Sequence, residues 1–437
     1  MVHKYVLILY IIYLFVFISP VIADGSKAAD KKLKPIGAGI IKEDDILELS
    51  WLIDHTITNN PSLKVIEKEA QAAEKRIRQA SALEDPVFTA GITNFPLIDM
   101  SFRSAPMTMK QIQLSQKFPF PGKRRLRENI AALKSEAIYY KYFEKQRELV
   151  NNVKQAYYEL AYIEEAIEIT RKNLELLSHL IKITQIKYEV GKGIRQDILK
   201  AQIEYSKINE ELIFLEQKHD NYRNKLIYLA YLPDDFKPGR TVKLTSDFTI
   251  PDKDLLISLA FDSRPLIMQY EKNIEKAKEE LRLAQKAILP DFQLSGSYGQ
   301  RDNSYADLFS VNISFNLPIY KNRKQDEGVL EKEFQILSQN AELDSLKNEI
   351  RFYITDQLIN IEKKKRLVSL FENSLLKQTI QVMDSAIANY EIDKTDFLSV
   401  IDAQMLYYKY EKEYYRALTD YYKALAQLEK ETGTSIF

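Results

Sequence analysis

Apolar residues recur at alternating steps of four and three along two long stretches of the chain. One series runs from Leu149 to Tyr188, and the other runs from Ala201 to Leu229. This spacing puts the apolar positions on one side of an α-helix and is typical of the seam between coiled-coil helices. Proline and glycine, which interrupt helices, are both absent from three stretches: 123–190, 194–232 and 329–432. The pattern therefore predicts a mainly α-helical protein with very long helices.

A different period marks four short segments. In one of them Phe309, Val311 and Ile313 alternate with polar residues, and similar alternation occurs in the other three. A period of two predicts a β-strand that has one apolar face and one polar face. Each segment has roughly nine to ten residues, the length that crosses a bilayer as a tilted strand of a β-barrel. We therefore predict membrane strands, with soluble hairpins as the alternative, at about 87–95, 110–118, 291–298 and 308–317.

The chain repeats itself after about 200 residues. The phrase SQKFPFPGKRR at 115–125 is echoed by SFNLPIYKNRK at 314–324, and YEVGKGIRQDILKAQ at 188–202 is echoed by YEIDKTDFLSVIDAQ at 390–404. Each half is predicted to contain a helix, a strand pair, a very long helix, a tight turn and a further helix. The predicted parts are a first repeat at 24–231 with a helical hairpin at 122–231, a linker at 232–254, and a second repeat at 255–437 with a hairpin at 321–432.

The repeated phrase also predicts where each strand becomes a helix. Pro119, Pro121 and Gly122 follow the second predicted strand, and Pro318 follows the fourth. Proline ends a strand because it cannot donate a ladder hydrogen bond, and glycine permits a sharp turn. Four strands cannot close a barrel, and the unpaired backbone groups of an open sheet edge find no water in lipid. Membrane strands would have to close with those of other copies, so the pattern predicts an oligomer.

The N-terminus has the pattern of a secretory signal. Lys4 precedes an unbroken apolar run at 5–18, and SPVIADG follows that run. We predict a signal peptide at 1–23 that is cut after Ala23. The alternative is an uncleaved membrane anchor, because the run is close to the roughly 18 apolar residues of a spanning helix.

Composition excludes several kinds of chemistry. The chain has no cysteine, which rules out disulfides, thiolate metal sites and cysteine nucleophiles. Basic and acidic residues number 62 each, so no basic surface for nucleic acid is indicated. Met100, Met107 and Met109 share one predicted loop and could hold Cu(I), although an apolar loop is the simpler interpretation. No phosphate-binding glycine loop or catalytic triad pattern occurs, so we predict no cofactor and no enzymatic activity.

The duplicated layout, the FPFPGK joint and the YEVGKG and YEIDKTD turns are similar to those of the TolC-like outer-membrane efflux channels. The resemblance implies a homotrimer with a 12-stranded β-barrel in the outer-membrane lipid, four strands per chain, that continues into a long α-helical barrel in the periplasm. It also implies a passive exit duct that docks a periplasmic adaptor protein and an inner-membrane pump. The phrase QKFPFPGKR is most similar to the branch that serves metal-cation pumps of the resistance–nodulation–division type.

The resemblance further implies a gate at the periplasmic end of the tunnel. Family members close this end with acidic residues on the helix that follows a hairpin turn. The matching positions are Asp197 and Lys200 in the first repeat and Ser399 and Asp402 in the second, so each pair keeps one acid. In a trimer Asp402 would form a ring of carboxylates, which favours cations. The alternative is that Asp402 is a solvated helix residue.

The two hairpin turns are the expected tips of the tunnel. The resemblance implies that they contact the adaptor, although glycine and aspartate suit a turn in any case. The residues concerned are Gly191, Lys192, Gly193, Asp393, Lys394 and Thr395. Two alternatives to an efflux duct are the same fold serving type I protein secretion and a periplasmic coiled-coil structural protein without membrane strands. The substrate and the identity of the pump stay open.

Overall fold

The computed structural model describes residues 46–245, 250–302 and 304–434. The described residues belong to one compact unit. The expected signal peptide at 1–23 lies outside the described residues. Among the described helices, none combines the length and the apolar character that a membrane-crossing helix requires.

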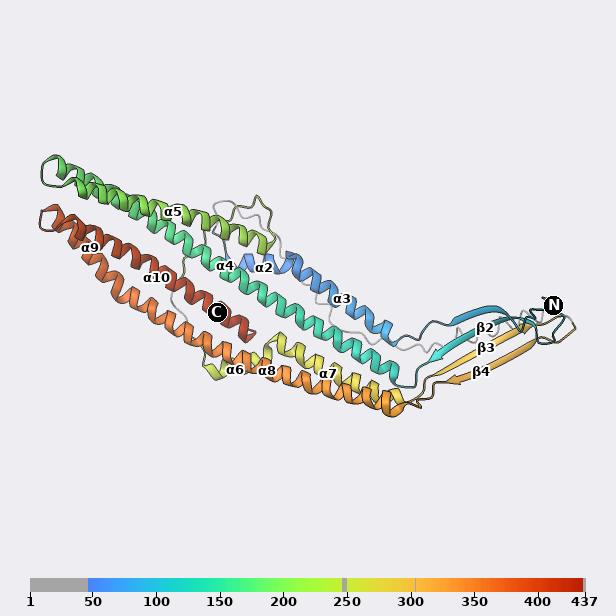
Figure 1. The fold of residues 1–437 in the computed structure, drawn as a ribbon. Coiled ribbons are helices and arrows are strands. Elements are labelled where there is room, and N and C mark those ends of the chain that lie inside the picture. Colours follow the sequence, from blue (N-terminus) through green and yellow to red (C-terminus); the bar gives the residue numbers. More distant parts are fainter. Residues whose placement is uncertain (1–45, 246–249, 303, 435–437) are drawn as a thin grey trace. The chain divides into compact units, whose positions relative to one another are not determined.

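Two similar series of elements follow each other along the chain (Figure 1). The first comprises α2 (Leu49–Asn59), α3 (Pro61–Ser81), β1 (Val87–Thr93), β2 (Met109–Phe118), α4 (Lys123–Glu189) and α5 (Arg195–Ala230). The second comprises α6 (Lys253–Ser263), α7 (Pro265–Gln285), a 3₁₀ turn η1 (Lys286–Ile288), β3 (Phe292–Gln300), β4 (Leu308–Phe315), α8 (Lys321–Leu370), a π-helical turn η2 (Phe371–Leu375), α9 (Leu376–Glu391) and α10 (Phe397–Thr432). The expected long hairpin of the second half is therefore interrupted by η2.

The four strands form one antiparallel sheet in the order β1-β2-β3-β4. Val87 lies opposite Ser115, and Phe292 lies between Phe118 and Phe315. The strands occupy the predicted segments, but β1 ends at Thr93 rather than 95 and β4 ends at Phe315 rather than 317. Asn94 has a positive φ of 52°, which takes the chain out of the extended conformation directly after β1.

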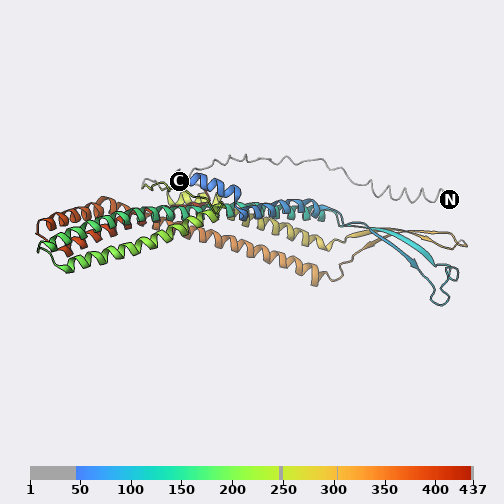
Figure 2. The ribbon, with the colours of Figure 1, turned by 90° about the horizontal axis from the view of Figure 1, so that it is seen from above.

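The sheet lies at one end of the helices and the two hairpin turns lie at the other (Figures 1 and 2). β2 and β3 are paired on both sides, whereas β1 and β4 are the edges of the sheet. The side chains of β4 are largely exposed, including Val311 and Ile313 at 60% each. Among the residues that the structure describes, the sheet therefore has two unpaired edges and an exposed apolar surface.

The starts of α3 and α7 are fixed by equivalent residues in the two halves. Asn60 precedes Pro61, and its side chain accepts a hydrogen bond from the Ser62 amide at 2.9 Å while its Nδ2 donates to the Leu229 carbonyl at 2.7 Å. Arg264 precedes Pro265 and binds Glu431 at 2.7 Å. Proline suits the first helical position because it lacks the amide that would be unpaired there. Each half thus ties the start of its short helix to the end of its hairpin.

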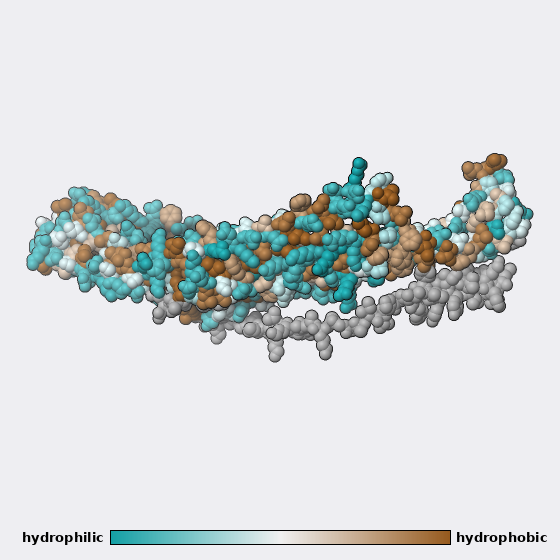
Figure 3. Space-filling model, turned by 90° about the horizontal axis from the view of Figure 1, so that it is seen from below, coloured by the Kyte–Doolittle hydropathy of each residue, from teal (hydrophilic) through white to brown (hydrophobic). Residues whose placement is uncertain are grey.

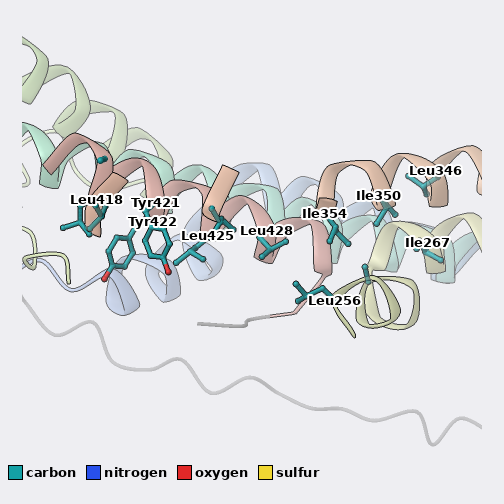
Figure 4. Close-up of a cluster of buried hydrophobic side chains, with 14 of the residues drawn as sticks. Leu256, Ile267, Leu346, Ile350, Ile354, Leu418, Tyr421, Tyr422, Leu425 and Leu428 are labelled. Atoms are coloured by element: carbon teal, nitrogen blue, oxygen red, sulfur yellow. The ribbon is translucent and has the colours of Figure 1, made fainter. Parts of the chain in front are cut away.

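The predicted coiled-coil seams form the core. Val153, Ala156 and Leu177 on α4 have no measurable exposure, and neither has Ala201 on α5. The prediction is wrong at Tyr188, which is 47% exposed close to the turn. Figure 4 shows a separate cluster in the second half that joins α6, α7, α8 and α10, with these labelled members: Leu256, Ile267, Leu346, Ile350, Ile354, Leu418, Tyr421, Tyr422, Leu425 and Leu428.

Candidate functional site at the helical hairpin tips

The two turns have the same backbone geometry. In the first, the Gly191 amide donates to the Tyr188 carbonyl at 3.0 Å and the Lys192 amide donates to the Lys187 carbonyl at 2.8 Å. In the second, the Asp393 and Lys394 amides make the equivalent bonds at 3.2 and 2.8 Å. This pair of bonds is the Schellman motif, which ends a helix with a residue in the left-handed conformation. Both turns can therefore be understood as helix C-caps.

The residue in the left-handed position differs between the turns. Gly191 has a φ of 75° and Asp393 has a φ of 61°. Glycine adopts this conformation without steric penalty, and aspartate is one of the few other residues that tolerate it. The second turn therefore carries a carboxylate where the first turn has no side chain.

Asp393 binds two lysines of the first hairpin. Its Oδ1 lies 2.5 Å from Lys187 Nζ, and its Oδ2 lies 3.1 Å from Lys192 Nζ. Lys187 also donates to the Tyr390 carbonyl at 2.5 Å and lies over the Tyr390 ring, 4.2 Å from the centroid. We call these four residues the tip clamp. It joins the α4–α5 turn to the α9–α10 turn within one chain.

The clamp changes the acidity of its members. Hydrogen bonds from Lys187 and then Lys192 hold the pKa of the Asp393 carboxyl below its ordinary value. Burial raises the pKa of Tyr390 to about 12, and the negative charges of Asp197 and Asp393 act in the same direction. Asp393 is therefore ionised, and Tyr390 is neutral, at neutral pH.

Asp197 is half-buried in the first turn of α5, beside the clamp. Burial raises the pKa of its carboxyl, Lys200 partly opposes this, and the negative charge of Asp396 adds to it. Asp396 caps α10, because its Oδ1 accepts from the Ser399 amide at 2.9 Å and from the Ser399 hydroxyl. Those hydrogen bonds lower the pKa of Asp396. The tip therefore contains three acids, because Asp396 lies close to Asp197 in addition to Asp393 of the clamp.

Asp396 was not among the gate positions that the family resemblance implied. An aspartate followed three residues later by a serine, directly before an apolar run, is an N-cap pattern that the sequence displays. Ser399, at a position where the resemblance implies an acid, serves as the partner of that cap. Asp402 is exposed on α10 and makes no ion pair with another described residue. No hydrogen bond or ion pair between described residues joins Asp402 to Asp197.

The expected adaptor-contact residues lie at the surface of the tip. Gly191, Lys192, Asp393 and Lys394 are exposed, and the turn residues that follow them, Gly193 and Thr395, are half-buried. Exposed apolar side chains flank both turns: Val190, Ile194 and Ile392, at 64%, 58% and 60%. Lys192 is engaged by Asp393, whereas Lys394 makes no ion pair with the part of the chain that the structure describes. The sequence alone suggested that Lys192 and Lys394 are equivalent. The structure shows that they are not, because Lys192 binds Asp393.

The strand-to-helix joint contains an unexpected buried ion pair. Gly122 precedes α4 with a φ of 90°, a left-handed conformation that favours glycine because side chains with a Cβ are strained there. Lys123 Nζ donates to Asp291 Oδ1 at 2.8 Å and to the Leu289 carbonyl at 2.7 Å. Lys123 is therefore a buried part of the joint, with a side chain that is only 8% exposed.

The described residues contain no group of three or more histidine or acidic side chains that could hold a metal ion. Met100 and Met107 are 71% and 50% exposed in the β1–β2 loop, and Met109 begins β2. His55 Nδ1 donates a hydrogen bond to the Ala230 carbonyl oxygen at the end of α5, at 3.1 Å. Because that oxygen is an acceptor, His55 Nδ1 carries the proton and has a structural role.

Comparison with known proteins identifies the architecture. The family model described as outer membrane efflux protein matches residues 52–230 and 256–434. The chain belongs to the outer membrane efflux protein family. Within that family it is similar to BepC of Brucella suis, 22% identical over 67% of this chain and 65% of BepC, and to TolC of Vibrio cholerae, 21% identical over 88% of this chain and 90% of TolC. The solved structure of the outer-membrane channel OprN has the same fold, with a TM-score of 0.75 over 95% of this chain and 99% of OprN at 18% identity.

Membership places the protein in the outer membrane as an efflux channel with a large periplasmic helical part. The expected family is thereby confirmed. Its relatives are conduits rather than enzymes.

Proposed function

We propose that three copies of this chain form a passive exit duct across the outer membrane. The supporting observation is the sheet, whose outer strands β1 and β4 each pair on one side only within the described part of one chain. Four apolar side chains on these strands are 58–65% exposed: Val87 and Phe88 on β1, and Val311 and Ile313 on β4. An apolar sheet with open edges is unstable in lipid, because the edge backbone groups lack partners. Closure with two further copies gives a 12-stranded barrel and satisfies every edge.

The helices offer a second surface for the same assembly. Phe334, Leu337, Phe352 and Ile359 on α8 are each more than 60% exposed, at 68%, 62%, 64% and 65%. Apolar areas are visible over the helices near the sheet in Figure 3. Exposed apolar patches of this kind mark interaction surfaces. In the proposed trimer, α8 packs against a neighbouring copy and the helices continue the barrel into the periplasm. The two ranges matched by the family model support the duplicated repeat that this arrangement uses.

The hairpin tips supply the proposed gate and docking surface. Asp402 and Asp197 are the gate candidates, and the tip clamp restrains the two hairpins of each chain. The exposed turn residues, with Val190, Ile194 and Ile392 beside them, provide a mixed charged and apolar surface for a periplasmic adaptor. An inner-membrane pump would supply the energy. A pump of the resistance–nodulation–division type for metal cations is supported by the QKFPFPGKR phrase alone.

The trimer is tested by the protein mass of the detergent-purified complex, from light scattering with the detergent contribution subtracted. The expected value is about three times the mass of one mature chain, which is somewhat less than the 50.9 kDa of the full sequence with its expected signal peptide. A monomer that is stable without detergent would overturn the duct and favour the periplasmic coiled-coil protein. Type I secretion uses the same assembly, so it is distinguished by whether the neighbouring genes encode a peptide exporter or a pump.

A further inference from the structure

A trough of about 800 Å³ lies between α3, α4 and α7, far from the hairpin tips. It occupies the part of the helices nearest the sheet, since α3 ends shortly before β1 and α4 begins shortly after β2. Its volume is within the range of small-molecule sites. The wall is largely apolar and consists of six alanines with Ile130, Ile138 and Leu283. The alanines leave space between the helices that larger side chains would fill.

Three cations line this trough without an ion-pair partner. Arg76 projects from α3, and Arg127 and Lys134 project from α4. None of the three makes an ion pair with another described residue. Arg127 acts electrostatically on Asp291, but that carboxylate is already bound by Lys123 at 2.8 Å.

The acids of the trough are already occupied. Glu69 lies 3.4 Å from Lys141, and Glu280 lies 3.3 Å from Lys332. These two are the acidic residues among those lining the trough. The wall therefore has an unbalanced positive charge above an apolar floor.

The second repeat reverses these charges. Aligning NNPSL at 59–63 with SRPLI at 263–267 places Glu280 at the position of Arg76. Aligning 115–125 with 314–324 places Asp326 and Glu333 at the positions equivalent to Arg127 and Lys134. The cations are therefore a property of this trough and not of the repeated fold.

The helices that line the trough form one layer. α3 packs on α4, α4 packs on α7, and α7 packs on α8. Lys332 of α8, which is bound to Glu280 of α7, also lines the trough, so the trough lies on one side of all four helices. In the proposed trimer, this side of the layer faces the tunnel. A molecule in transit would meet the trough before it enters the barrel.

We propose that this trough binds an amphipathic anion in transit. The apolar body of the ligand lies on the alanine floor, and its sulfonate, sulfate or carboxylate group lies against Arg76, Arg127 and Lys134. Guanidinium groups match the geometry of such anions and bind them through paired hydrogen bonds. The inference rests on the proposed duct for its biological meaning and names a substrate class for it. The trough therefore favours an amphipathic anion over the metal cation that the QKFPFPGKR phrase suggests, since a metal cation would be repelled at the same place.

Direct binding tests the site separately from transport. The full-length channel in nanodiscs of zwitterionic lipid is titrated with 8-anilinonaphthalene-1-sulfonate and, in parallel, with its uncharged analogue N-phenyl-1-naphthylamine, after subtraction of empty nanodiscs. The variant carrying Arg76→Gln, Arg127→Gln and Lys134→Gln should raise the Kd of the sulfonate roughly tenfold, since each partly exposed charge pair contributes about a factor of 1.4 to 5. The Kd of the uncharged analogue should not change.

Two further variants control for structure. Glu333→Gln alters the equivalent position of the second repeat and should leave both affinities unchanged. Ala131→Leu fills the trough, and leucine is native at the equivalent position 330, so it should weaken both probes while the trimer mass stays constant. An unchanged sulfonate affinity in the triple variant would overturn the proposal. A second result would also overturn the proposal: the triple variant loses the trimer, and Ala131→Leu binds both probes normally. The three cations would then hold copies of the chain together instead of binding a ligand.

One outcome concerns the source of the anion. If phosphatidylglycerol in the nanodisc abolishes sulfonate binding that survives in zwitterionic lipid, the trough holds an anionic lipid and the assignment to a molecule in transit is wrong. Failure of the duct itself would appear elsewhere, as absence of a trimer or of ion conductance, with sulfonate binding intact.

Discussion

The two helical hairpins share a backbone plan but differ in their tips and in their continuity. α4 is one helix of 67 residues, whereas the equivalent helix of the second half is divided by the π-turn η2 between α8 and α9. Phe371 of η2 lies against Tyr410 of α10, with ring centroids 6.1 Å apart. π-Turns contain one more residue than the helix around them needs and are frequent at functional sites. The second hairpin therefore has a built-in irregularity that the first lacks.

The tips differ in a complementary way. The first hairpin supplies lysines to the tip clamp, and the second supplies the carboxylate of Asp393. Asp396 caps α10, whereas Ile194 at the equivalent position of α5 provides no side-chain cap. Differences at a few turn positions thus make two similar hairpins into partners that bind each other.

The largest expected effect comes from single-residue deletions. Deleting Asn373 removes the extra residue of η2 and leaves the flanking helices in register, so the melting temperature should stay close to that of the parent protein. Deleting Glu175 from α4 rotates the following side chains by about 100° and takes Leu177 and Leu180 out of the core. Each lost core side chain costs about 2–5 kcal/mol, so the tip should unfold. Thermal unfolding followed by circular dichroism measures both variants. Equal losses of stability in the two deletions would show that η2 is an integral part of the packing rather than a spare residue.

The next effect concerns the acids that differ between the hairpins. Asp402→Asn should reduce the preference for cations, because a ring of carboxylates concentrates them at the gate. We expect a decrease of at least about twofold in the permeability ratio, measured as the reversal potential in a potassium chloride gradient. Lys200→Gln alters the equivalent position of α5 and should move the ratio in the opposite direction. If neither substitution changes the reversal potential, Asp402 is a solvated helix residue and does not belong to the gate.

Much of the helical fold follows from spacing along the chain. The seams through Val153 and Leu177 were predictable because the period of apolar residues is a local property. The π-turn was not, since FENSL continues a helical pattern without proline or glycine. Strand bounds shifted by one or two residues where a single positive φ, as at Asn94, ends the extended conformation.

The candidate site was less predictable, because its contacts join distant parts of the sequence. Lys187 and Asp393 are 206 residues apart, and Lys123 and Asp291 are 168 apart. No local pattern indicates which lysine reaches which carboxylate over such separations. Asp396 is the exception, since its capping pattern lies within four residues of sequence and could have been recognised.

A smaller effect is expected when the second turn is made like the first. Asp393→Gly keeps a residue that suits the left-handed conformation but removes the partner of Lys187 and Lys192. The hairpins of one chain should then separate more readily, and the conductance of the closed channel in planar bilayers should rise roughly two- to fivefold. Lys394→Gln, at a neighbouring exposed lysine without an ion pair, is the matched control and should have little effect. In concentrated salt the difference between parent and Asp393→Gly should shrink because exposed charges are screened. A conductance equal to that of the parent at low salt would mean that the clamp does not restrain opening.

The smallest effect is a pH dependence with two opposite steps, one from each hairpin. Burial raises the pKa of Asp197, so its ionised form is unfavourable at neutral pH and the penalty disappears as the pH falls through the raised pKa. Lys187 and Lys192 lower the pKa of Asp393. The stability that its ion pairs give the tip is therefore fully present above the ordinary aspartate pKa of about 3.9. This stability is lost only as the pH falls through the still lower pKa of the folded protein. Mild acidification should therefore tighten the closed tip, and stronger acidification should loosen it. Channel conductance against pH should fall slightly and then rise, with Asp197→Asn removing the first change and Asp393→Asn removing the second. A single monotonic change that both variants retain would show that neither carboxylate controls the tip, because the opposite signs follow from one acid being buried and the other being bound by lysines.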